Sequence, residues 1–390
     1  MKLKYIFLIL SLVVLFFVFY KQYDLGQRYT TENMTGLGGC SSQDGPDSKP
    51  PPSCKNEYNN SAELPLREYC VKACFNSAYD GANVSSNVLM ERIKDGYRFI
   101  DLNVFSASGD VYVGFSQDNA PTTVSSKLLL SDALKTINDS AFNIGTVFDA
   151  SLSNVASYPI IVHIRVYRPT DSTIDIIENV ATIINGTKGS PPSYSANYLR
   201  SFDENGMSIP KQIDGCTVLS SIMGKVIFSM DILNILEIYS PINMQSALTV
   251  PPQTVESIQT FVNILSGGST FPAFYRYKEE SLIYRMNKLG IGNSALKGSL
   301  QTNAKHMYIS FPHPDDVSTT SNNNKNATGV VQPDIKSFIL DRSVQFTPLR
   351  VYLDHPELNA YIKMFDTIGT PFAPMIYVYK YLTSSSQPKK

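Results

Sequence analysis

The sequence carries almost no net charge. It has 33 lysines and arginines against 34 aspartates and glutamates, which gives a formal net charge of -1. This balance excludes a globally basic nucleic-acid binder, so we expect no nucleic-acid partner. The sequence also has no G-x-G-x-x-G or G-x-x-x-x-G-K-S/T motif at the end of a predicted strand. Such glycine-rich loops hold phosphates, and their absence weakens a nucleotide-binding interpretation.

Cysteine is scarce as well, with 5 residues in the chain of 390. The spacing Cys70-x-x-x-Cys74 does not indicate a zinc site, because no second Cys/His cluster follows at metal-ligand spacing. If the body of the protein lies in an oxidising compartment, Cys40 and Cys54 are expected to form a disulfide. The alternative is that the cysteines are free or buried thiols.

One apolar run stands at the start of the chain. Tyr5 to Tyr20 contains no charge and only Ser11 as a polar residue. A membrane span needs about 17–25 apolar residues, and the stems of Lys4 and Lys21 extend this run. A cleaved signal peptide is the alternative, but the run ends in aromatic residues rather than small ones. We predict a single transmembrane anchor at residues 1–21, with charges that weakly favour a non-cytosolic body.

Six N-x-S/T sequons occur, and they matter only if the body faces a secretory lumen. They lie at Asn33, Asn59, Asn83, Asn138, Asn185 and Asn326.

The rest of the chain divides into a stalk, a large domain and a polar tail. We place the stalk at residues 22–65, which are rich in Pro, Gly and Ser, the domain at 66–382, and the tail at 383–390. In the domain, short apolar runs alternate with helical patterns, which predicts an α/β barrel, with an open doubly wound sheet as the alternative. The predicted strands are Tyr69–Asn76, Arg98–Val104, Ile160–Tyr167, Lys225–Met230, Ala273–Tyr277, His306–Phe311, Gln345–Tyr352 and Met375–Tyr381. The predicted helices are Asn87–Lys94, Leu129–Asn138, Thr173–Ile184, Val255–Leu265 and Leu358–Ile368.

Several motifs of this domain occur in one order along the chain. They are Gly96–Val104, Val111–Gly114, Ser126–Leu129, Asp132–Leu134, Tyr158–Val162 and Gly224–Ile227. In this order they resemble the phosphatidylinositol-specific phospholipases C, a family with a TIM-barrel-like fold. Four further segments resemble the phospholipase-C-like proteins of large eukaryotic DNA viruses: Asn76–Tyr79, Phe271–Lys278, Val344–Phe346 and Tyr361–Gly369.

The resemblance implies a site that has lost its chemistry. The two catalytic histidine positions of the family fall on Tyr79 and Val113, and neither side chain is a proton acceptor at neutral pH. The family's phosphate-binding lysines fall on Ser229 and Asp231, and an acid repels phosphate. Arg98 is the arginine of the G-x-R motif. We therefore expect no catalytic residues.

The resemblance also implies a lost metal site. Calcium ligands of the family correspond to Asp80, Asp101, Asn103 and Arg165, and a guanidinium cannot coordinate a cation. We expect Arg165 to pair with Asp80 or Asp101 in place of the ion, and we expect no cofactor. His163 is interpreted as a core histidine on the same strand face as Arg165. For His306, His313 and His355, surface or capping roles are expected.

Together these features favour a membrane-anchored, catalytically inactive phospholipase-C-like domain with a binding or structural role, plausible in a viral or infected-cell membrane. Its partner beyond the membrane would be a lipid head group or a protein. The alternative is a metal-independent phosphodiesterase acting on phosphoinositides or related phosphodiesters. That enzyme would use Tyr79, Asp80 and Arg165, with His163 as a further candidate.

Overall fold

The computed structural model describes only part of the chain, and all of that part belongs to one compact unit, Glu57–Lys390. The predicted anchor and most of the stalk lie outside the described residues. Within the described residues, no helix combines the length and the apolar character that a membrane crossing requires. The described ranges are 63–115, 126–142, 156–166, 173–186, 197–202, 208–231, 258–266, 274–278, 307–311, 335–342 and 344–384.

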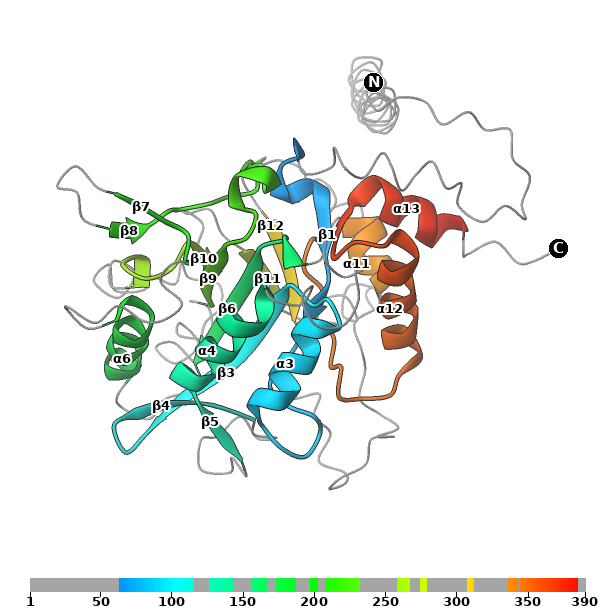
Figure 1. Ribbon diagram of the computed structural model, residues 1–390. Coiled ribbons are helices and arrows are strands. Elements are labelled where there is room, and N and C mark those ends of the chain that lie inside the picture. Colours follow the sequence, from blue (N-terminus) through cyan, green and yellow to red (C-terminus); the bar gives the residue numbers. More distant parts are fainter. Residues whose placement is uncertain are drawn as a thin grey trace, which may run out of the picture. The chain divides into compact units, whose positions relative to one another are not determined.

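The largest sheet has the strand order β10-β9-β6-β3-β4-β5, and β2 also pairs with β3 (Figure 1). The strands β2, β3, β6, β9 and β10 run parallel, while β4 and β5 continue the sheet as an antiparallel meander. Their bounds are β2 Ala73–Cys74, β3 Phe99–Ala107, β4 Asp110–Gly114, β5 Lys127–Leu129, β6 Ile160–Val166, β9 Val226–Asp231 and β10 Ile264–Ser266.

Three smaller pairings accompany this sheet. They are β1 (Tyr69–Val71) with β13 (Phe372–Pro374), β7 (Arg200–Phe202) with β8 (Ser208–Pro210), and β11 (Phe274–Lys278) with β12 (Met307–Phe311). Single bridges from Phe346 to Val71 and Ile309 continue the parallel arrangement from β1 to β12. Strands β10 and β11 pack together, but the pairings found in the described residues do not close into a barrel. The architecture is therefore mixed α/β, and the described strands form separate sheets rather than the predicted closed barrel.

Helices follow several of the strands, and α3 and α12 begin with a side-chain cap. The Ser85 hydroxyl accepts a hydrogen bond from the Val88 amide (3.3 Å) at the start of α3. His355 Nδ1 accepts from the Glu357 amide (3.2 Å) at the start of α12, and Gly369 ends that helix with φ 82°. The capping role expected for His355 is thus confirmed. The helices are α3 Ser86–Lys94, α4 Leu130–Ala141, α6 Thr173–Asn185, α11 Ile335–Arg342, α12 Pro356–Ile368 and α13 Met375–Ser384, with 3-10 turns at Leu66–Glu68 and Leu219–Ile222.

The central strands separate two apolar cores, because successive side chains of a strand point to opposite faces. Ile100, Leu102 and Ile164 belong to the core shared with α3, α4 and the other helices. Phe99 and Ile161 belong to the second core, which also holds Phe346 and Met307. Burying one such side chain stabilises the fold by about 1.5–3 kcal/mol. Every residue of Ile160–Val166 is buried, which explains why this strand is recognisable as a continuous apolar run.

Several predicted elements need correction. Met375–Tyr381 is helical, because Met375, Val378 and Leu382 are its buried residues and their spacing of three and four fits one helix face. The segment 345–352 forms single bridges at Phe346 and Leu349 rather than a strand. Of the predicted helix Val255–Leu265, residues 255–257 lie outside the described residues, residues 258 and 259 are helical, and β10 occupies the end of the predicted range.

Candidate functional site

The register of three parallel strands brings polar residues into one interior layer. Asp101 on β3 pairs with His163 on β6, which pairs with Ser229 on β9. Asn103 and Arg165 form the next pair of β3 and β6 on the same face of the sheet. Directly paired residues of parallel strands point to the same face, so these five side chains share one face of the sheet. All five are buried.

Arg165 and Asp101 form a two-pronged ion pair inside this layer. Arg165 Nε donates to Asp101 Oδ1 at 2.7 Å, and Arg165 Nη2 donates to Asp101 Oδ2 at 2.7 Å. The side chain of Arg165 is 5% exposed and that of Asp101 is 0% exposed. Paired geometry of this kind is the strong form of an arginine–carboxylate contact. The pairing expected from the sequence, with Asp101 as the partner, is therefore present in the structure.

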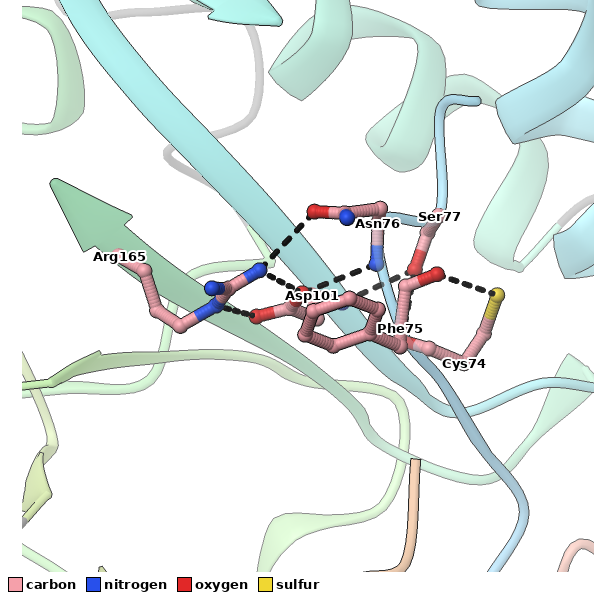
Figure 2. A network of polar contacts seen from close by, with 6 residues as sticks. All are labelled: Cys74, Phe75, Asn76, Ser77, Asp101 and Arg165. Carbon is pink, nitrogen blue, oxygen red and sulfur yellow. Dashed lines mark hydrogen bonds and ion pairs between the residues drawn. The ribbon is translucent and has the colours of Figure 1, made fainter. Parts of the chain in front are cut away.

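Asn76 completes the cluster from the segment after β2. Arg165 Nη2 also donates to the side-chain oxygen Oδ1 of Asn76 (2.9 Å). The backbone N–H of Asn76 donates to Asp101 Oδ2 (2.9 Å). Figure 2 shows dashed lines from the guanidinium to both of these side chains. The guanidinium carbon lies 4.5 Å from the centre of the Phe75 ring, within the range of a cation–π contact. The charge of Arg165 is thus matched by one carboxylate and enclosed by protein.

Ser77 fixes the backbone of Asp101 beside this cluster. The Asp101 amide donates to Ser77 Oγ (2.9 Å), and the Ser77 amide donates to the Asp101 carbonyl (2.8 Å). Asn76 has a φ of 46°, a left-handed conformation that asparagine tolerates better than most residues. Neither Asn76 nor Ser77 was predicted as a site residue. The signal that could have found them is their position immediately after β2, next to the strand that carries Asp101.

Tyr79 and Val113, the two degenerate histidine positions, lie at the same end of the sheet. They line a shallow pocket together with Asn76, Asp101 and Asn103. This space is too narrow to hold a water molecule. The Tyr79 ring stacks on Phe115 with ring centres 4.0 Å apart. Burial raises the pKa of the Tyr79 phenol to about 12, so the phenol keeps its proton at neutral pH.

His163 contacts a serine hydroxyl and an aromatic ring. Its Nδ1 lies 3.0 Å from Ser229 Oγ, and its ring stacks on Phe99 with centres 5.3 Å apart. His163 and Ser229 are both 0% exposed. This environment agrees with the interpretation of His163 as a core histidine.

Three other predicted site residues lie apart from the cluster or are not described. Arg98 Nη2 donates to the Ala141 carbonyl (3.1 Å) at the C-terminal end of α4. The partial negative charge of a helix C-terminus stabilises a cation at this position. Arg98 is thus outside the interior layer, and its predicted place in the site is corrected. Asp80 Oδ1 accepts from the amides of Ala82 and Asn83, both at 2.7 Å, in a local turn. Asp231 ends β9, and its side chain is not among those described.

The residues that are present do not suit a calcium ion. Both carboxylate oxygens of Asp101 and the amide oxygen of Asn76 accept hydrogen bonds from Arg165, so a metal ion would meet a positive charge. Asn103 Oδ1 is a buried acceptor without a hydrogen-bond partner, but one neutral oxygen does not make a site. Across the described residues, no group of three His, Cys, Asp or Glu side chains is placed to hold a metal.

Comparison with known proteins gives a fold but no sequence family. No family model and no curated protein matches the chain. The solved structure of S. officinalis PLC21 matches 81% of this chain at 11% identity with a TM-score of 0.50, and L. pealei PLC21 matches the same share with a TM-score of 0.49. A calcium-dependent phosphoinositol-specific phospholipase C from Pseudomonas sp. matches 68% of this chain at 12% identity with a TM-score of 0.31. This chain covers 37% of the length of each PLC21 chain. The chain therefore has a phospholipase-C-like fold, and the likeness extends to the fold alone.

Proposed function

We propose that this chain is a membrane-anchored phospholipase-C-like domain that does not cleave phosphodiesters and acts as a binding or structural protein. The observation that carries the proposal is the buried Arg165–Asp101 pair, in which a fixed guanidinium holds both carboxylate oxygens. The guanidinium of Arg165 occupies the place where we would expect calcium-dependent proteins of this fold to hold a metal cation. The carboxylate oxygens of Asp101 are therefore not available to a metal or a substrate.

The acid–base groups support the same conclusion. Val113 has no titratable group, and Tyr79 is a poor base because its pKa is raised to about 12. Each general acid or base typically contributes about 10²–10⁴-fold to a rate. Without either role, a domain of this fold should show little phosphodiester cleavage.

The membrane anchor and the setting of the protein are proposed from the sequence. Residues 1–21 would hold the domain on a membrane, with the body on the non-cytosolic side. The resemblance to phospholipase-C-like proteins of large DNA viruses supports a viral or infected-cell membrane. The body would then present its surface to a lipid head group or to another protein, without a cofactor.

A metal-independent phosphodiesterase is the second candidate, and one observation favours it. His163 Nδ1 lies 3.0 Å from Ser229 Oγ, an arrangement in which a histidine can accept a hydroxyl proton. Both residues are 0% exposed, however, so a substrate would reach them only after the interior layer opened. We therefore rank this function below the inactive domain.

A cleavage assay on the full chain in detergent micelles separates the two functions. Phosphatidylinositol would be supplied in the micelles, and release of inositol phosphate would be measured with calcium and with chelator. We expect no release above the protein-free blank in either condition. Turnover in chelator that disappears in His163→Gln but persists in Lys135→Ala, a surface variant, would replace our proposal with the enzyme.

A further inference from the structure

Three sequons fall within the described residues, and the structure separates them. Asn138 and Asn185 are half-buried residues of α4 and α6. Asn138 Oδ1 accepts from Asn197 Nδ2 at 3.0 Å, and Asn185 Nδ2 donates to the Thr260 carbonyl at 3.4 Å. Both side chains are thus partly covered and are tied to neighbouring segments through their amide groups. Asn83, in contrast, is exposed.

Asn83 lies in a tight turn between β2 and α3. The Asp80 amide donates to the Asn83 carbonyl (3.1 Å), and the Asp80 carboxylate accepts from the Asn83 amide (2.7 Å). Tyr79 and Val84 bridge the base of the turn, and Gly81 allows it through a φ of 104°. The backbone of Asn83 is therefore held from both sides while its side chain faces solvent.

The serine of this sequon, Ser85, has an extended backbone. Ser85 has φ -154° and ψ 158°, and its hydroxyl serves as the cap of α3. Asn83 is thus exposed and Ser85 is half-buried in the residues just before the helix begins. Among the sequons of the described residues, Asn83 thus has the local structure that tolerates a bulky substituent.

We propose that Asn83 carries an N-linked glycan. This inference rests on the non-cytosolic body of the proposed function. In the modification, the side-chain amide nitrogen of Asn83 forms a bond to C1 of an oligosaccharide supplied as a lipid-linked pyrophosphate. The bond between C1 and the pyrophosphate breaks, the lipid pyrophosphate leaves, and the amide nitrogen loses one proton. No oxidant or reductant is needed.

The position of this glycan has a consequence for the pocket. Tyr79 and Val84, which flank the turn at both ends, line the same pocket as Asp101 and Asn103. A glycan on the turn stands beside Tyr79 and Val84 and keeps a bilayer surface away from this face, because oligosaccharides are bulky and strongly hydrated. The glycan thus favours a protein over a lipid head group as the partner of this face.

Peptide mass spectrometry on the full chain, produced in mammalian cells, tests the inference. Enzymatic removal of N-glycans converts each modified asparagine to aspartate, so we expect this conversion at Asn83. Asn83→Gln should remove one glycan from the gel mobility pattern, whereas Ser85→Thr, which keeps the sequon and a capping hydroxyl, should retain it. Asn138→Gln and Asn185→Gln serve as matched controls and should leave the pattern unchanged.

An unmodified Asn83 in the membrane-associated protein overturns the inference in every case. Glycans on Asn33 or Asn59 without one on Asn83 would refute this site while leaving the non-cytosolic body intact. A chain without any glycan would refute both the site and the proposed orientation. Cleavage activity is measured separately, so the catalytic part of the proposed function is tested independently.

Discussion

Replacing Arg165 with alanine is the sharpest test of the buried ion pair. The change removes two hydrogen bonds of 2.7 Å to Asp101 and one of 2.9 Å to Asn76. It leaves the carboxylate of Asp101, which is 0% exposed, without its counter-ion. Breaking a buried pair by removing one partner costs about 3–5 kcal/mol. Arg165→Ala should therefore lower the free energy of unfolding by about that amount.

A surface pair with the same separation provides the control. Lys135 Nζ lies 2.7 Å from Asp139 Oδ2, but the two side chains are 64% and 51% exposed. Pairs of this kind on a helix surface contribute about 0.3–0.5 kcal/mol. Lys135→Ala should therefore cost about one tenth as much as Arg165→Ala. The comparison sets a buried, two-pronged pair against an exposed pair with a single contact at the same distance.

Far-UV circular dichroism during thermal or urea unfolding is the suitable assay, because the chain has no tryptophan to report on unfolding. A drop of 3–5 kcal/mol corresponds to a melting temperature lower by roughly 5–10 °C in a domain of this size. Arg165→Glu should be less stable still in chelator, because it places a second carboxylate beside Asp101 with no cation. The variant should recover part of its stability when calcium is added, because the new carboxylate and the four side-chain oxygens of Asn76, Asp101 and Asn103 could then bind the ion. An Arg165→Ala variant that melts like the parent would refute the counter-ion argument and leave Arg165 free to bind phosphate.

Three further results are expected. Millimolar calcium should not raise the melting temperature of the parent, since a ligand of the native state must stabilise it; a clear rise that Asp101→Ala abolishes would reveal a metal site. Deleting residues 1–21 should give a soluble, folded body, and a truncated protein that stays with membranes after a high-salt wash would indicate a second membrane surface. Burial raises the pKa of Tyr79 to about 12 from 10.0, so the unfolded chain loses this proton first. The free energy of unfolding that this shift contributes is complete below pH 10 and is lost as the pH rises through about 12. In urea titrations over that pH interval, Tyr79→Phe should lose less stability than the parent protein. Equal losses in the two proteins would contradict the argument.

The central strands could be predicted because they are buried on both faces. Ile160–Val166 is apolar apart from His163 and Arg165, and the structure forms β6 over all of these residues, as predicted. Met375–Tyr381 failed because its tyrosines and valine alternate as they would in a strand. The packing of Met375, Val378 and Leu382 against the core decides for a helix, and that contact is tertiary.

The site was accessible from the sequence only in part. Asp101 and Asn103 could be placed on one strand face by alternation, and the same alternation assigns Arg98 to the opposite face. The prediction for Arg98 followed the motif instead of the alternation, and its contact with Ala141 corrects it. Asn76 was missed, because its contact with Arg165 depends on the pairing of β2 with β3 and on a left-handed residue, and its position after β2 is only an indirect signal.

The aromatic contacts at the pocket link three loops that are distant in sequence. Tyr79 follows β2, Phe115 follows β4, and Tyr352 lies after the segment that bridges to β1 and β12. The Tyr79 ring contacts the other two, with centres 4.0 Å from Phe115 and 4.9 Å from Tyr352. Phe115 and Tyr352 also contact each other at 5.8 Å. Three mutually contacting rings cannot separate one at a time without exposing apolar surface, so these loops should open as one cooperative unit and show matching amide hydrogen-exchange rates.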